Sequence, residues 1–206
     1  MESLYDASAA ALALFLILGA VDGLYLHLWK YRLYARAASR DEHRLHTAGA
    51  VLFAATLPAL FCWETAGLAL WVGVALIAAD MGVSLLDMVS ERESRADLGG
   101  LSTGEYVLHM LIMTFRGAAI GLVLGGRPAA AWALDAPLAL RSMPGLAGTL
   151  AWQALPGAVV VAALHVWLCA PRGVRAFEAL RSRVAAARTG VATGAGCCAA
   201  TTTSGS

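Results

Sequence analysis

Charged side chains are scarce in this sequence. Asp, Glu, Lys and Arg make up 14% of its 206 residues and hydrophobic residues 59%, whereas an ordinary soluble domain carries roughly 25% charged residues. The net charge is only +1 and the cations form no dense basic patch, so the sequence does not indicate a nucleic-acid partner. With a mean hydropathy of +0.68, the composition predicts an integral membrane protein whose main partner is the lipid bilayer.

The four cysteines also lack a recognisable pattern. None of them form the CxxC spacing of zinc ribbons and thioredoxin-like proteins. Cys62 and Cys169 lie near predicted helix ends, while Cys197 and Cys198 are neighbours in a tail of small residues. We therefore predict no thiolate metal site and interpret the tail thiols as incidental, with acylation or redox activity of the pair as the alternative.

Long apolar runs are what the sequence does contain. A helix needs ~20 mostly apolar residues to cross a bilayer, and five segments reach this length: 8–28, 45–63, 67–90, 104–125 and 148–170. The N-terminus lacks the basic region of a signal peptide and carries Glu2 and Asp6 instead, so we expect the first segment to be retained. The predicted fold is an all-α membrane bundle of about five transmembrane helices, spanning 1–171.

The cations predict how this bundle is oriented. They are concentrated in the connections 29–44 and 91–103 and after the last span. The positive-inside rule then places the N-terminus outside and the C-terminus in the cytoplasm of a multi-pass inner (plasma) membrane protein. A basic surface helix is predicted at 172–189 and a disordered tail at 190–206. In the loop 126–147, the apolar stretch 129–140 is expected to form a surface or re-entrant helix.

Histidines and carboxylates gather near the predicted cytoplasmic end of the bundle. They are His27, His43, His46, His109, His165, Asp87, Glu91 and Glu105. Ionisable groups are costly in a membrane and are normally retained only where they are paired or functional. Counting along the helices gives a deeper layer that contains His46, Asp87, His109, His165 and Asp22, and a shallower layer that contains His27, His43, Glu91 and Glu105. This convergence predicts a site that faces the cytoplasm.

The donor atoms of this site are of the kind that binds transition metals. Neutral imidazole and carboxylate together suit iron, manganese or zinc, and no thiolate is placed to select a softer ion. His43 and His46 are i, i+3, and Glu105 and His109 are i, i+4, so each pair shares a helix face. The principal predicted ligands are His46, His109, His165, Asp87 and Glu105. The supporting or second-metal ligands are His27, His43 and Glu91.

In broad layout, helices with clustered ligands at the cytoplasmic side, this arrangement resembles the membrane-bound non-haem di-iron hydroxylases, desaturases and oxidases. The resemblance implies oxidation of a lipid-soluble substrate by a metal-dependent oxidoreductase. Five histidines are fewer than the histidine boxes of desaturases require, and Glu105 and His109 are four residues apart rather than the three of paired ExxH boxes. We therefore assign no family.

Three other functions remain open from the sequence. A b-type haem protein would use His109 with His165 or His46 as axial ligands. A proton- or ion-coupled transporter would use Asp22, Asp80 and Asp87 as a relay. An accessory membrane subunit would need only its helices and loops. The sequence identifies neither the substrate nor the oligomeric state.

Two acidic residues also have structural interpretations. Ser102 and Glu105 have the spacing of a capping box at the start of a helix. Asp80 lies roughly 16 Å along its helix from Glu91, and Arg116 lies at about the same depth on the next helix. We predict a buried Asp80–Arg116 ion pair with a structural role.

Overall fold

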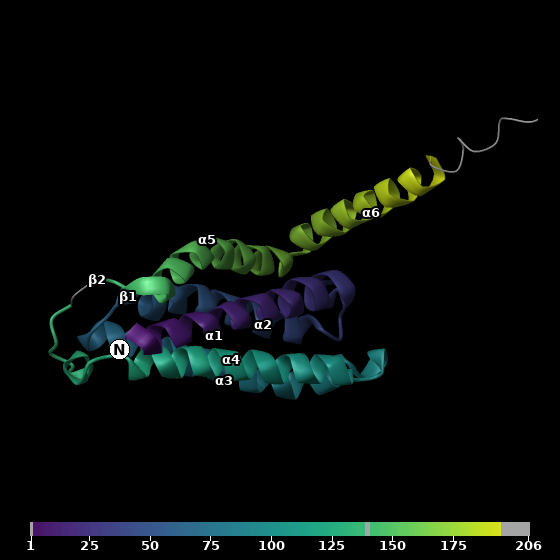
Figure 1. Ribbon diagram of the computed structural model, residues 1–206. Helices are drawn as coiled ribbons and strands as arrows, with labels where there is room; N and C mark the ends of the chain where they lie inside the picture. The colour runs from purple at the N-terminus through teal and green to yellow at the C-terminus, as the bar shows by residue number, and fades with distance from the viewer. Residues whose placement is uncertain (1, 139–140, 195–206) are drawn as a thin grey trace, which may run out of the picture. The chain divides into compact units, whose positions relative to one another are not determined.

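The computed structural model describes residues 2–138 and 141–194. It divides the chain into two units, Met1–Val166 and Trp167–Ser206. The long helices are α1 (Glu2–Ala20), α2 (Arg40–Thr56), α3 (Gly67–Ser94), α4 (Thr103–Gly125), α5 (Gly145–Leu168) and α6 (Pro171–Gly194) (Figure 1). The shorter helices are η1 (Val21–Lys30), η2 (Leu33–Ala35), η3 (Leu57–Cys62), η4 (Ala96–Leu98) and η5 (Ala129–Trp132), and the two strands are β1 (Trp63–Glu64) and β2 (Arg141–Ser142).

Among the described residues, five helical segments are long and apolar enough to cross a membrane. They are Ser3–Ala35, Arg40–Cys62, Gly67–Ser94, Thr103–Gly125 and Gly145–Leu168. This confirms the prediction of an all-α chain with five such helices. Large apolar side chains also face outward on them, including Leu68, Leu86 and Met110, which are 69%, 62% and 60% exposed. Such surfaces are consistent with contact to a lipid bilayer.

The core of the first unit forms where these helices pack in pairs. Helix α1 packs along α4 and helix α2 along α3 (Figure 1). Two hydrogen bonds join α1 to α4 and its C-terminal end: the Ser8 hydroxyl donates to the Ala119 carbonyl at 2.8 Å and the Tyr5 hydroxyl to the Gly126 carbonyl at 2.9 Å. The fully buried apolar residues include Leu12, Leu57, Leu60, Phe61, Leu70 and Val123.

Two of the membrane-length segments contain π-helix, with its i→i−5 hydrogen bonds. The first segment changes from α1 into η1, and the Tyr31 amide closes this stretch by donating to the Leu26 carbonyl at 2.8 Å. The second changes from α2 into η3, which begins next to Pro58. Proline has no amide hydrogen to donate to the preceding turn, so the regular α pattern is interrupted there.

The two strands and the loop before α5 lie at one end of the bundle, which we call the strand end (Figure 1). β1 and β2 are antiparallel, with Trp63 opposite Ser142 and Glu64 opposite Arg141. The buried Arg127 side chain donates to the carbonyls of Leu60 at 2.7 Å and Trp63 at 2.9 Å. These bonds satisfy backbone acceptors that the end of η3 leaves without a helical partner.

The loop 126–147 contains less helix than the sequence suggested. Only Ala129–Trp132 is helical within 129–138, as a short 3₁₀ turn, and residues 139–140 lie outside the described residues. Ala133, directly after this turn, has an extended backbone with φ −67° and ψ 131°, so the apolar stretch does not continue as a helix.

In the second unit, α6 occupies the segment for which we predicted a basic surface helix. Its helix runs from Pro171 to Gly194 and thus continues past Gly190, where the sequence predicted a disordered tail to begin. The rest of that tail, including Cys197 and Cys198, lies outside the described residues.

Gly67 and Gly82 on α3 provide a matched test of the turn that precedes this helix. Gly67 has φ +59°, and a Cβ there would lie 2.4 Å from the Ala136 carbonyl oxygen. Gly67→Ala is therefore expected to destabilise the protein by at least about 1–2 kcal/mol. A Cβ on Gly82 would meet nothing within 4 Å, so Gly82→Ala should be neutral or stabilising by up to about 1 kcal/mol. Detergent unfolding curves measure both; equal midpoints would contradict this account.

Candidate metal centre

The five histidines come together at the end of the bundle away from the strands, which we call the polar end. The ring of His27 lies 3.8 Å from that of His46 and 6.1 Å from that of His109, measured between centroids. The rings of His43 and His165 are 5.4 Å apart. His27, His43 and His165 are only 1%, 2% and 3% exposed. The clustering that the sequence indicated is therefore present in the first unit.

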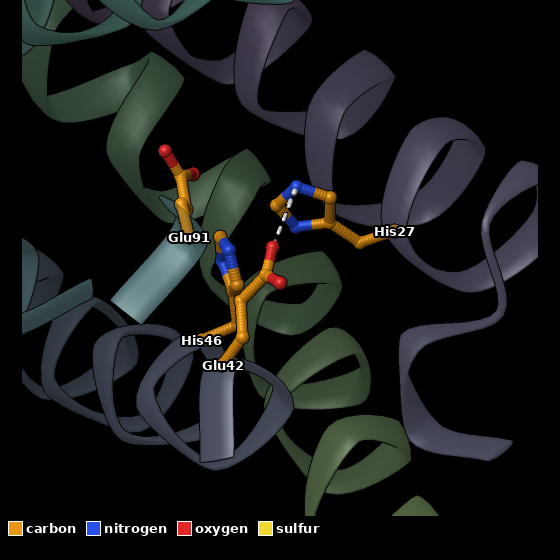
Figure 2. Close-up of side chains that lie close together, drawn as sticks. All are labelled: His27, Glu42, His46 and Glu91. Carbon is orange, nitrogen blue, oxygen red and sulfur yellow. Dashed lines mark ion pairs between the residues drawn. The ribbon is translucent and has the colours of Figure 1, made fainter. Parts of the chain in front are cut away.

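Within the described part of the chain, four side chains form the largest group of possible metal ligands, which we call the four-residue group. It consists of His27 from η1, Glu42 and His46 from α2, and Glu91 from α3. One ligand atom from each residue lies within 4.8 Å of the others. Figure 2 shows the imidazole of His27 facing the carboxylate of Glu42, with an Nε2–Oε1 distance of 4.0 Å. Glu42 and His46 are i, i+4, so one face of α2 presents both.

A second group adjoins the first through His27. It contains Asp22, His27 and His109. The π-helical turn of η1 brings Asp22 and His27, five residues apart, onto one face, and His27 Nε2 lies 3.4 Å from Asp22 Oδ1. His109 on α4 links the groups: its Nε2 lies 3.1 Å from Asp22 Oδ1 and its Nδ1 lies 3.3 Å from Glu91 Oε1.

The structure mixes the two layers that we expected to be separate. His27 and Glu91 were assigned to the shallower layer, yet His27 stacks edge-on against His46, and Glu91 contacts His109. The wider π-helical turn changes both the depth and the direction of the η1 side chains relative to an α-helix, which accounts for His27. Glu91 lies on the α-helix α3 and reaches His109 on the neighbouring α4. The predicted neighbours His46 and Asp87 do meet, with 3.1 Å between Nε2 and Oδ2.

The ligands predicted from the sequence include neither Glu42, which belongs to the four-residue group, nor Arg95, which holds Glu42 in place. The Arg95 side chain is 1% exposed. The guanidinium donates to Glu42 Oε1 from Nε at 3.2 Å and from Nη2 at 3.1 Å, and to Glu105 Oε1 from Nη1 at 3.0 Å. The Tyr31 ring lies 4.5 Å from its central carbon, and the Ser94 hydroxyl donates to the other Glu42 oxygen. Arg95 therefore fixes the orientation of Glu42 within the four-residue group.

Glu105 lies outside both groups, although the sequence suggested it as a ligand. Its Oε2 accepts hydrogen bonds from the Ser102 hydroxyl at 2.8 Å and the Tyr31 hydroxyl at 2.9 Å. With the Ser102 backbone it completes a capping box at the start of α4. Its other oxygen accepts from Arg95. These contacts match the interpretation of Glu105 as part of a capping box. They connect Glu105 to the centre only through Arg95.

His43 and His165 form a separate pair of imidazoles. Their rings are nearly parallel, with 20° between the planes. Both His43 nitrogens and His165 Nδ1 are buried without a hydrogen bond of normal geometry to any described residue. A buried polar atom is normally satisfied, so these nitrogens are available for a ligand.

The three aspartates that the sequence suggested as a proton relay are each paired within the described part of the chain. Asp80 contacts Arg116, with 2.9 Å between Oδ2 and Nη1. Asp22 contacts two histidines and Asp87 contacts His46. The Arg116 guanidinium also donates to the Ser84 hydroxyl at 2.8 Å. The predicted Asp80–Arg116 partners thus lie at ion-pair distance.

Comparison with known protein families, with curated protein sequences and with solved structures gives no match for this chain. The structure presents a His/Asp/Glu cluster that could hold a metal ion. Its imidazole nitrogens and carboxylate oxygens are ligands for intermediate and harder divalent ions.

Proposed function

We propose that this chain is a multi-pass membrane protein that binds a first-row transition metal ion through the four-residue group. The observation that carries the proposal is the meeting of two imidazoles and two carboxylates from three helical segments within 4.8 Å. Donors held about 2.0–2.2 Å from a tetrahedral ion lie roughly 3.5 Å apart. Small side-chain rotations therefore suffice to close this group around one ion.

The state of the donor atoms supports this assignment. His27 is 1% exposed, and neither of its ring nitrogens makes a hydrogen bond of normal geometry to a described residue. Leaving such a group buried and unsatisfied costs free energy, which a bound ion would recover. Because the shell contains nitrogen and oxygen but no sulfur, iron, manganese or zinc is the expected metal.

We further propose that the bound metal serves an oxidoreductase acting on a lipid-soluble substrate. When bound, such an ion supplies Lewis-acid or redox chemistry. The surrounding side chains would hold it: Arg95 orients Glu42, and Asp87 orients His46 in the way that carboxylates orient metal-binding histidines. The apolar outer surface of the helices supports access for a substrate dissolved in the bilayer.

The same proposal includes an orientation and a location. The polar end would face the cytoplasm of an inner (plasma) membrane protein, because Arg and Lys are concentrated in the connections at that end. The bundle would cover 1–171, the basic segment 172–189 would lie on the cytoplasmic surface, and the tail would follow. A periplasm-specific reporter fused after residue 190 should be inactive, and activity there would overturn this orientation.

Metal analysis of matched glutamate variants tests the binding site. Protein purified in mild detergent should contain at least one equivalent of iron, manganese or zinc and show no Soret band. Glu91→Gln removes a proposed ligand and should weaken binding by more than the about 10–100-fold typical of outer-shell changes. Glu64→Gln, in β1 at the strand end, is the control and should retain the metal. Elemental analysis and equilibrium dialysis measure both.

Results that differ from these expectations would point to another function or to another metal site. A Soret band would assign the histidines to b-type haem. Absence of metal from protein made in metal-replete medium, together with pH-dependent ion flux in vesicles, would favour a transporter. Equal metal content in wild type and both variants would place any bound metal elsewhere in the chain.

A further inference from the structure

His43 and His165 have no role in the four-residue group, although both are nearly fully buried at the same end of the bundle. They come from different helices, α2 and α5, and their rings are stacked with 5.4 Å between centroids. Two imidazoles that ligate one tetrahedral ion at about 2 Å have ring centres about 5 Å apart. The observed separation is close to this value, and because the ring planes are stacked at 20° to each other, both rings would turn about their Cβ–Cγ bonds to direct a nitrogen at one ion.

We propose that His43 and His165 form a second metal position, so that the centre binds two ions rather than one. The inference rests on the proposed metal-binding function. Its support is the set of unsatisfied nitrogens: both of His43 and Nδ1 of His165.

The second position lies close to the first. His43 and His46 are i, i+3 on α2 and therefore about 4.5 Å apart along the helix axis. Ions in two-metal centres are typically about 3.5–4 Å apart, and such a pair of ions needs ligands from neighbouring positions on one helix face. One face of α2 would thus supply a ligand to each ion.

The two positions differ in the number of ligands that the protein supplies. Four side chains meet at the first position, whereas two imidazoles meet at the second. Sites that use all coordination positions for protein ligands are usually structural, and sites with open positions are usually catalytic. The second ion would therefore leave positions open for water or a small substrate, and in a two-ion centre the oxidoreductase chemistry proposed above would take place beside it rather than at the four-residue group alone.

Zinc stoichiometry and cobalt titration test the second position in the full-length protein. Wild type should bind two equivalents of Zn²⁺, and Co²⁺ should add in two spectroscopic steps. His165→Ala should bind one equivalent, with the second step weakened by more than the about 10–100-fold of an outer-shell change. Thr47→Ala, one turn beyond His43 on α2, is the matched control and should retain both equivalents.

The outcomes separate the two proposals. No bound metal in wild type would overturn both, whereas one equivalent that His165→Ala leaves unchanged would overturn only the second position. If His165→Ala does not give monodisperse protein, the variants His43→Asn and His165→Asn are tested in its place, because asparagine keeps a polar side chain in the buried site. Two equivalents retained by both Asn variants would also overturn the inference.

Discussion

Replacement of Arg95 by methionine is expected to lower the free energy of unfolding by about 3–5 kcal/mol, the range for breaking a buried ion pair. The 1%-exposed guanidinium lies between Glu42 and Glu105 and makes hydrogen bonds to both. Methionine fills similar volume but leaves two carboxylates without their cation. A titration of folded protein with SDS measures the loss, and metal binding should weaken with it because Glu42 loses its fixed orientation.

Arg36→Met is the matched control for this substitution. Arg36 also forms an ion pair, with Asp97, but the two side chains are 25% and 60% exposed. Exposed pairs contribute about 0–1 kcal/mol, so this variant should unfold almost as wild type does. Adding Glu42→Gln to Arg95→Met should recover part of the loss, since one stranded charge is removed. Similar losses for Arg95→Met and Arg36→Met would contradict the central role of the buried network.

The helices of this protein could be predicted from sequence because each requires only a long apolar run. The five segments expected from hydropathy all correspond to helices of membrane length. Their ends were less certain: the first segment reaches Ala35 rather than residue 28. Hydropathy does not detect the π-helix η1, which continues α1 with a different side-chain spacing.

Because hydropathy and residue counting assume regular α-helix, they predict the site well only where its residues lie on regular α-helices. His46 and Asp87 lie on regular α-helices, so counting residues placed them at one depth, and they are 3.1 Å apart. His27 lies on η1, and the same counting placed it in the wrong layer. Arg95 was counted only as a cation for orientation, since the fold of the turn after α3 decides whether it points outward or back toward Glu42.

The Asp80–Arg116 pair offers the second large expected effect. Both side chains are largely buried, 7% and 11% exposed, near the middle of helices long enough to span a membrane. Asp80→Ala would leave the Arg116 guanidinium with the Ser84 hydroxyl and methionine sulfurs as its remaining partners. Because an unpaired charge is costly in such surroundings, we expect a loss of about 3–5 kcal/mol for Asp80→Ala and a similar loss for Arg116→Met.

The double variant Asp80→Ala/Arg116→Met separates pairing from burial. If the two charges stabilise each other, removing both should cost clearly less than the sum of the single losses, with a coupling energy of up to about 3 kcal/mol. Thr114→Ala, at an exposed position two residues before Arg116 on α4, is the control, because the Thr114 hydroxyl donates back to the Met110 carbonyl of its own helix. This variant should change the free energy of unfolding by less than about 0.5 kcal/mol. SDS unfolding of the four proteins and wild type completes the cycle. Additive losses would show that the two side chains stabilise the bundle independently, and the ion pair would then have no structural role.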